Sequence, residues 1–277
     1  MTFRSLTGGV ALLTTALLAS GASAQRLTVT VQNLSPTSGT FLTPFWFGIQ
    51  DGTFNTVQIG ANASTAIERI AEDGNFSPLV SAFAASGKGA AQGIVFGNSI
   101  PPIMPGETAS FSFDVDGTSP MARYFSYASM VIPSNDAFIA NDNPMEHRLF
   151  SDSGQFQSMD FVIAGNEVLD SGTEINDELP ANTAFFGQAA GNTGVNENGI
   201  VHLHNGFNAK GSGGILDSPR FANADFRAAG YNIARISITA VPEPGAVALL
   251  FGSALSGLTI LLRRRRVRRE PGGSTIR

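Results

Sequence analysis

The stretch RLTVTVQN, residues 26–33, alternates apolar Leu27, Val29 and Val31 with polar residues, mostly threonine. Because successive side chains of a β-strand point to opposite faces, this alternation predicts a strand with one buried and one exposed face. Such a strand is stable only when other elements cover its apolar face. The rest of the chain must therefore supply a second layer.

Six further stretches have the composition of strands, and clusters of Gly, Asn and Pro separate them. One of them, ASFSFDVDG, is expected to place Phe111, Phe113 and Val115 on one face. The six are TPFWFGIQDG (43–52), ASFSFDVDG (109–117), ARYFSYASMVIP (122–133), SMDFVIAGNEVLD (158–170), GIVHLHNGF (199–207) and YNIARISITAV (231–241). This many short strands predicts a mainly β fold, an antiparallel β-sandwich.

One or two short helices interrupt this pattern. In STAIERIAEDG, residues 64–74, we expect Thr65 and Glu68 to form a capping box and Gly74 to end the helix. A second helix is expected to begin at Pro78 with Ser77 as its cap. Its apolar face would carry Leu79, Ala82 and Phe83.

The first 24 residues follow the pattern of a secretory signal peptide. Arg4 precedes an apolar stretch at residues 10–18, and the small residues ASA at 22–24 supply a cleavage site. The sequence therefore predicts a signal peptide over residues 1–24 and export of a chain that begins near Gln25.

The C-terminus carries a second targeting pattern. Residues 245–262 lack charged side chains, and six arginines follow within residues 263–269. As a helix, the apolar segment would reach about 27 Å and could cross a membrane, with the arginines on the cytoplasmic side. With the Pro-Glu-Pro motif at 242–244, the segment 241–270 resembles the PEP-CTERM sorting signal of Gram-negative bacteria, and residues 271–277 follow it as a tail. The resemblance implies that an exosortase cuts near Pro-Glu-Pro and releases the body to the surface or to the exopolysaccharide matrix.

The body, residues 25–240, is strongly acidic. It contains nine basic and twenty acidic side chains, a formal charge of −11 against −5 for the whole chain. This balance argues against nucleic acid as a partner and is compatible with cation binding, although acidity also simply keeps an exported protein soluble. The chain has no cysteine, which excludes disulfides, thiol catalysis and cysteine-based zinc sites.

Three carboxylates stand close to predicted strand ends. Asp136 follows the strand that stops at Pro133, Asp170 ends another strand, and Gly172 permits a tight turn that brings Glu174 back. Such loop carboxylates can converge on a calcium ion, which takes roughly six to eight oxygen ligands. They can equally be solvated loop acids, which is the ordinary role of Asp in turns. Spacing alone leaves both interpretations open.

A family resemblance favours calcium. The segments MVIPSNDAF (130–138) and LDSGTEIND (169–177) resemble the two signature segments of the spondin N-terminal domain family, and the order of the remaining elements agrees over residues 26–240. The resemblance implies a C2-like β-sandwich with a calcium site in the loops at one end. It maps the three acids of that site, in chain order, onto Asp136, Asp170 and Glu174. Glu174 stands where animal members carry Asp, and Ala137 replaces an aromatic residue.

Two other sites are possible. His202 and His204 alternate on a predicted strand and so point to one face, where they could hold a transition metal with His147 as a third ligand. That would suit a metal-dependent hydrolase, but no HExxH motif is present and a polar strand face without metal is the simpler explanation. Trp46, between two phenylalanines, could stack on a sugar in a polysaccharide-binding module, or could pack in the core.

The sequence as a whole therefore predicts an exported, non-catalytic, calcium-binding β-sandwich protein. Its expected place is the bacterial surface or extracellular matrix, and its expected role is adhesion or matrix interaction. The expected partners are an exosortase, the membrane through residues 245–262 before processing, and exopolysaccharide or surface proteins. Nucleic acid is not among them.

Overall fold

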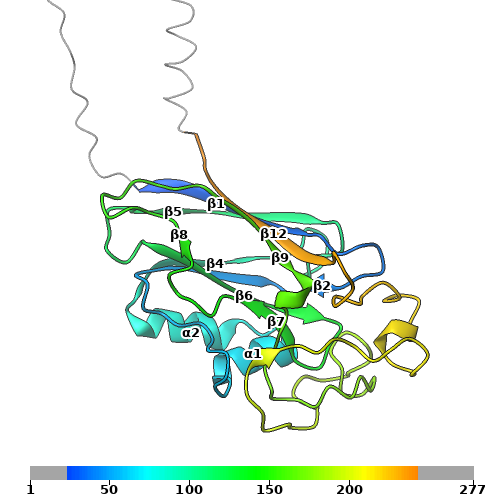
Figure 1. The fold of residues 1–277 in the computed structure, drawn as a ribbon. Coiled ribbons are helices and arrows are strands. Elements are labelled where there is room, and N and C mark those ends of the chain that lie inside the picture. The colour runs from blue at the N-terminus through cyan, green and yellow to red at the C-terminus, as the bar shows by residue number, and fades with distance from the viewer. Residues whose placement is uncertain (1–23, 243–277) are drawn as a thin grey trace, which may run out of the picture.

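The computed structural model describes residues 24–242, which form two antiparallel β-sheets and two helices. The sheets lie one above the other, and both helices lie on the outer side of the larger sheet (Figure 1). The prediction of a mainly β sandwich is thus confirmed. Almost all of the predicted signal peptide and the whole predicted membrane helix lie outside the described residues. Within residues 24–242, no helix combines the length and the apolar character needed to cross a membrane.

The smaller sheet has the strand order β5-β1-β12-β9. Its strands are β1 (Gln25–Asn33), β5 (Thr108–Val115), β9 (Met159–Ala164) and β12 (Asn232–Ala240). The predicted strand at 26–33 is its second strand, and Leu27, Val29 and Val31 have no exposed surface. These side chains point to the larger sheet, whereas Thr28 and Thr30 bond to Ser112 and Ser110 of β5 on the outer face.

The larger sheet has the order β11-β10-β7-β6-β3-β4, with β2 and β8 also paired to β6. Its strands are β2 (Phe41–Leu42), β3 (Phe45–Gln50), β4 (Gly89–Val95), β6 (Tyr124–Ile132), β7 (Ala137–Ala140), β8 (His147–Arg148), β10 (Leu169–Asp170) and β11 (His202–Leu203). Two 3-10 turns complete the elements, η1 (Gly165–Glu167) and η2 (Ile215–Asp217).

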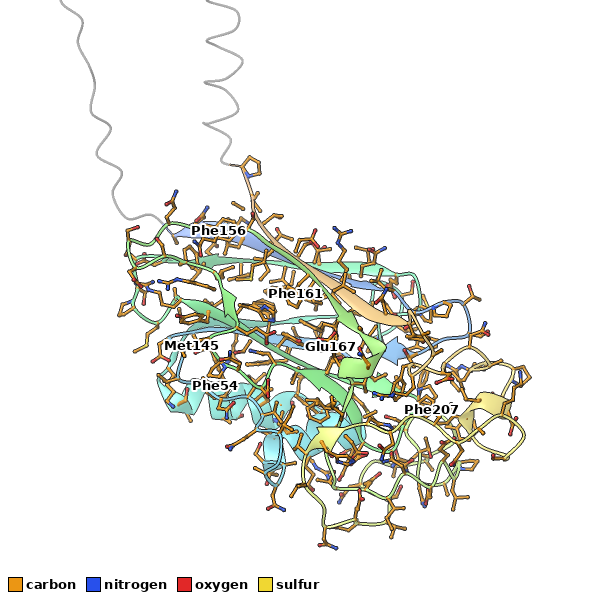
Figure 2. The ribbon with its side chains drawn as sticks, in the orientation of Figure 1. Phe54, Met145, Phe156, Phe161, Glu167 and Phe207 are labelled. Atoms are coloured by element: carbon orange, nitrogen blue, oxygen red, sulfur yellow. The ribbon has the colours of Figure 1, made fainter. Side chains whose placement is uncertain are left out.

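The main core fills the space between the sheets. Phe47 of β3 lies there with Phe113 of β5 and Phe125 of β6, at ring-centroid distances of 5.1 and 6.0 Å. Phe161 of β9 also projects between the layers (Figure 2) and contacts Tyr127 of β6. Phe111 faces the same side of β5 as Phe113 but is 39% exposed, because it lies near the sheet edge.

Both faces of β3 are buried because the helices α1 (Thr65–Asp73) and α2 (Ser77–Ser86) cover its outer side. Trp46 packs there against Phe83 of α2 at 5.4 Å between ring centroids. Alternation is therefore absent in this strand, as expected for a strand that is covered on both sides.

Three details of the predicted helices are wrong. The cap of α1 is Ser64 rather than Thr65, since its hydroxyl accepts the Ile67 N–H at 3.3 Å. Gly74 ends the helix in the left-handed conformation, as predicted. In α2, Leu79 and Phe83 are buried but Ala82 is exposed, and Ser77 is already helical because residue 76 occupies the cap position.

The sheet register decides what lies at one end of the sandwich. The short turn between β6 and β7 carries Asp136, and β10 pairs antiparallel with β7 so that Asp170 lies opposite Ala137. The long segment that follows β10 covers this end with little regular structure (Figure 1). Asp136, Asp170 and the start of that segment are thereby brought together.

Replacing Phe47 by Ala tests the two-sheet core. Removal of a fully buried phenylalanine should lower the free energy of unfolding by about 3–5 kcal/mol, because the cavity cannot be refilled by its neighbours. Phe111→Ala, at a partly exposed position, should cost clearly less. Chemical denaturation of both variants measures the difference, and equal losses would contradict this packing.

Candidate functional site

Asp136 is a fully buried carboxylate with two unequal oxygens. Its Oδ2 accepts hydrogen bonds from the Ser171 hydroxyl at 2.8 Å and from the backbone N–H groups of Thr173 and Glu174 at 2.9 and 3.1 Å. Its Oδ1 is buried and has no hydrogen-bond partner among the described residues. Oδ2 therefore holds the loop after β10 in place, and Oδ1 remains available to accept a further hydrogen bond or to bind a cation.

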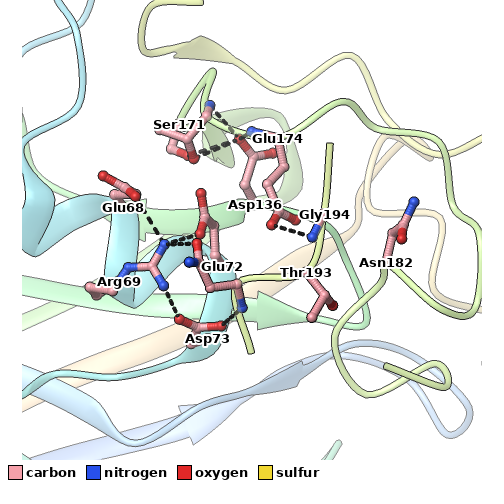
Figure 3. Close-up of polar contacts among 12 residues, drawn as sticks. Glu68, Arg69, Glu72, Asp73, Asp136, Ser171, Glu174, Asn182, Thr193 and Gly194 are labelled. Atoms are coloured by element: carbon pink, nitrogen blue, oxygen red, sulfur yellow. Dashed lines mark hydrogen bonds and ion pairs between the residues drawn. The ribbon is translucent and has the colours of Figure 1, made fainter. Parts of the chain in front are cut away.

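Glu174 has the same asymmetry. Its Oε1 accepts the Gly194 N–H at 3.1 Å, while its Oε2 is buried without a hydrogen-bond partner among the described residues. A Cβ at position 194 would lie only 2.1 Å from the Glu174 carboxyl carbon, so the backbone of residue 194 can approach only as glycine. Figure 3 shows Asp136 and Glu174 side by side at this point.

Asp170 adjoins the pair but is fully hydrogen-bonded. Its Oδ1 accepts the Gly172 N–H at 2.8 Å, and its Oδ2 accepts the Asn176 side-chain amide at 2.6 Å. The structure thus brings all three predicted acids to one end of the sandwich. Of these three acids, only Asp136 and Glu174 present a buried oxygen without a hydrogen-bond donor among the described residues.

The C-terminal turn of α1 adds acids that the sequence analysis missed. Glu72 is buried and pairs with Arg69, which also bonds Asp73 at 2.6 Å and Glu68 at 2.9 Å (Figure 3). Asp73 in turn accepts the Asn192 N–H at 2.9 Å, which ties the helix to the segment that carries Gly194. No sequence signal relates residues 72 and 192, because only the tertiary fold joins them.

Burial makes these carboxylates hard to ionise. It raises the pKa of Glu174 to about 8, with a further contribution from the negative charge of Glu72. Burial and the nearby charge of Asp136 raise the pKa of Asp170 to about 6. Burial also raises the pKa of Asp136, and this effect outweighs the hydrogen bonds donated to its Oδ2. Without a cation, negative charge on these acids is therefore less favourable than it is in water.

The buried oxygens without hydrogen-bond donors are relevant to whether calcium could bind at this site. Buried carboxylate oxygens that lack any donor are costly, and a hard cation is a partner that satisfies them. The free oxygens of Asp136 and Glu174 are of the ligand type that calcium takes, and Asp170 lies beside them. Over residues 24–242, however, no group of three or more His, Asp or Glu side chains is close enough to form a ready-made metal site.

His202 and His204 both approach Asp170, so they lie on one side of the chain, as their alternation predicts. His202 Nε2 lies 3.8 Å and His204 Nε2 4.0 Å from Asp170 Oδ2. His204 is fully buried, and its nitrogens are used within the protein. Nδ1 accepts the Gly206 N–H at 2.9 Å, so Nε2 carries the proton and donates to Asn176 at 3.1 Å. Burial lowers the pKa of His204 to about 4.

His147 and Trp46 lie elsewhere. His147, in β8, stacks on Phe161 with ring centroids 4.0 Å apart, inside the sandwich rather than beside the other histidines. Trp46 has no exposed surface, and its indole N–H donates to Gln92 at 2.9 Å. A three-histidine site is thus not formed, and Trp46 is a core residue that a sugar ring does not reach.

Comparison of the chain with models of known protein families gives no match, and a search of curated proteins gives none either.

In the absence of calcium, the chain is expected to lose stability as the pH rises from about 6.5 to 8.5. The folded pKa of Glu174, about 8, lies above its reference value of 4.5, so the folded state binds a proton that the unfolded chain releases. That stabilisation is full only below the unfolded pKa of about 4.5, and it declines as the pH rises until it levels off above the folded pKa, so the last part of the loss falls between pH 6.5 and 8.5. The buried His147 and His204 ionise below this window.

Thermal melting in EDTA measures the effect, and we expect a fall in Tm of roughly 5 °C across the window. Glu174→Gln keeps the shape but cannot ionise, so its Tm should change much less. An equal fall in the variant would assign the pH dependence to another group.

Proposed function

We propose that this chain is an exported, non-catalytic calcium-binding protein whose body is a spondin-type, C2-like β-sandwich. The single observation that carries the proposal is the pair of buried carboxylate oxygens without donors, Asp136 Oδ1 and Glu174 Oε2, at one end of the sandwich. They belong to two of the three acids that the spondin resemblance maps onto a calcium site.

Calcium would act on the loops rather than on a substrate. Asp136 Oδ2 already holds the turn at Ser171 and Thr173, and Glu174 holds Gly194 of the distant segment. Calcium supplies two positive charges, so Asp136 and Glu174 could both be ionised without repelling each other. The ordered loop end would then serve as a surface for adhesion or for contact with the matrix.

The termini support the location. The signal-peptide pattern at 1–24 and the PEP-CTERM-type segment at 241–270 support export, transient membrane anchoring and processing by an exosortase. The net charge of −11 in the body supports a role outside nucleic-acid binding. The likeness to exported matrix proteins therefore rests on both ends of the chain and on the loop cluster.

A calcium-dependent melting experiment tests the proposal. Calcium at a hundredfold excess over its Kd should stabilise the wild-type chain by about 2.7 kcal/mol, or roughly 5–10 °C in Tm. Asp136→Asn removes a buried charge and keeps the shape, so in EDTA it should melt no lower than wild type, yet it should lose the calcium shift.

Asp160→Asn is the matched control, because it removes the same charge from an exposed side chain on the outer face of the smaller sheet. It should keep the full calcium shift. A wild-type chain that does not respond to calcium, or a control that loses the response equally, would refute the calcium site.

A further inference from the structure

Arg220 lies on an aromatic platform away from the acidic cluster. Its guanidinium carbon is 4.2 Å from the ring centroid of Phe185, 5.0 Å from that of Phe221 and 5.7 Å from that of Phe41. The residue is nevertheless exposed. Stacking uses the flat faces of the guanidinium, so its N–H groups, which lie in the plane, remain directed outward at the edges.

Those N–H groups have no partner within residues 24–242, since Arg220 makes no hydrogen bond or ion pair there. Other arginines of the body are engaged: Arg69 bonds three carboxylates, and Arg235 makes two bonds of 2.7 Å to Asp160. Arg227 also lacks a carboxylate partner within residues 24–242, but its side chain donates to the Asn166 carbonyl, whereas Arg220 has no such bond. Its free donors are therefore available to a ligand.

The platform is fixed by the fold rather than formed by chance contact. Phe185 adopts a positive φ of 63°, a conformation that costs free energy for a bulky residue, and its ring meets that of Phe41 edge-on at 5.1 Å. The adjacent Ala184 N–H donates to Ser134 at 3.0 Å. On the other side, buried Glu178 accepts the Ile215 N–H at 2.8 Å and holds the turn before Arg220.

We infer that Arg220 and its platform form a binding position for a carboxylate on a polysaccharide, that is, for a uronic acid unit. The guanidinium fork matches the two oxygens of a carboxylate, and partly exposed Phe41 and Phe185 offer apolar surface to the adjoining sugar ring. A body with a charge of −11 repels a polyanion in general, so binding one requires a localised cation of this kind.

This inference rests on the proposed matrix function and names the chemistry of its partner. In the structure, the Arg220 platform and the proposed calcium site are connected through one turn. Ser134, which holds the Phe185 loop, is two residues from Asp136, and Asn135 between them bonds Asp177 at 3.2 Å. The same short turn therefore carries the calcium ligand and supports the carboxylate platform.

Binding of polygalacturonate to the purified full chain, measured by isothermal titration calorimetry, tests the inference. Arg220→Gln should weaken binding by about tenfold or more, because it removes a charge-assisted pair of hydrogen bonds. Arg220→Lys keeps the charge and lacks the planar fork, so it should also lose most of the affinity. Lys210→Gln, the same change of charge at an exposed site in the neighbouring loop, should stay within about twofold of wild type.

Neutral dextran should not bind, and dextran sulfate should bind more weakly than polygalacturonate if the site is built for carboxylate. Unchanged affinity in Arg220→Gln would overturn the inference, and so would an equal loss in Lys210→Gln. If Arg220→Gln fails to fold, Arg220→Lys decides the question. Full affinity in Arg220→Lys would overturn the inference that the planar guanidinium group binds the carboxylate.

Repeating the titration in EDTA separates the two proposals. Binding through Arg220 should persist without calcium, even in a chain that shows no calcium-dependent melting. Binding that needs calcium and ignores Arg220 would overturn this inference and leave the calcium site standing.

Discussion

The end of this β-sandwich depends on Asp136, a carboxylate with no exposed surface. Its Oδ2 accepts four hydrogen bonds from residues 171–174 and so decides the path of the chain after β10. Its Oδ1 collects none. A buried charge is tolerated only when it is paired, protonated or bound to a cation, and this one constraint makes the loop end sensitive to its ionic surroundings.

The buried acids at this end of the sandwich link distant parts of the chain, so a change in their charge affects all of these parts. Glu174 joins residue 136 to Gly194, and the acids of α1 join residue 192 through Asp73. The stability of several segments that are far apart in the sequence thus depends on the charge of the same group of acids. A cation that neutralises these charges would stabilise the helix α1, the turn after β10 and the long covering segment together. The core between the sheets is held separately, by its aromatic packing.

The sandwich itself is predictable from the sequence, because alternation in residues 26–33 and repeated turn residues are local signals. The convergence of Asp136 and Asp170 was predicted only through the spondin resemblance and the strand ends that carry them. Glu72, Gly194 and the Arg220 platform were not predicted. Their roles arise from contacts between segments far apart in the sequence, such as that of Arg220 with Phe41, for which no local pattern exists.

For the histidines, the sequence predicts the local arrangement but not the tertiary surroundings. Alternation correctly predicts that His202 and His204 lie on one side of the chain, but it does not reveal that both approach Asp170 or that His204 is buried and already bonded through both nitrogens. The free oxygens of Asp136 and Glu174 are the proposed calcium ligands, and equilibrium dialysis with radiolabelled calcium tests this directly. We predict one tightly retained ion per wild-type chain and none for Asp136→Asn. A wild-type chain that retains no calcium, or a variant that retains as much, would contradict the account.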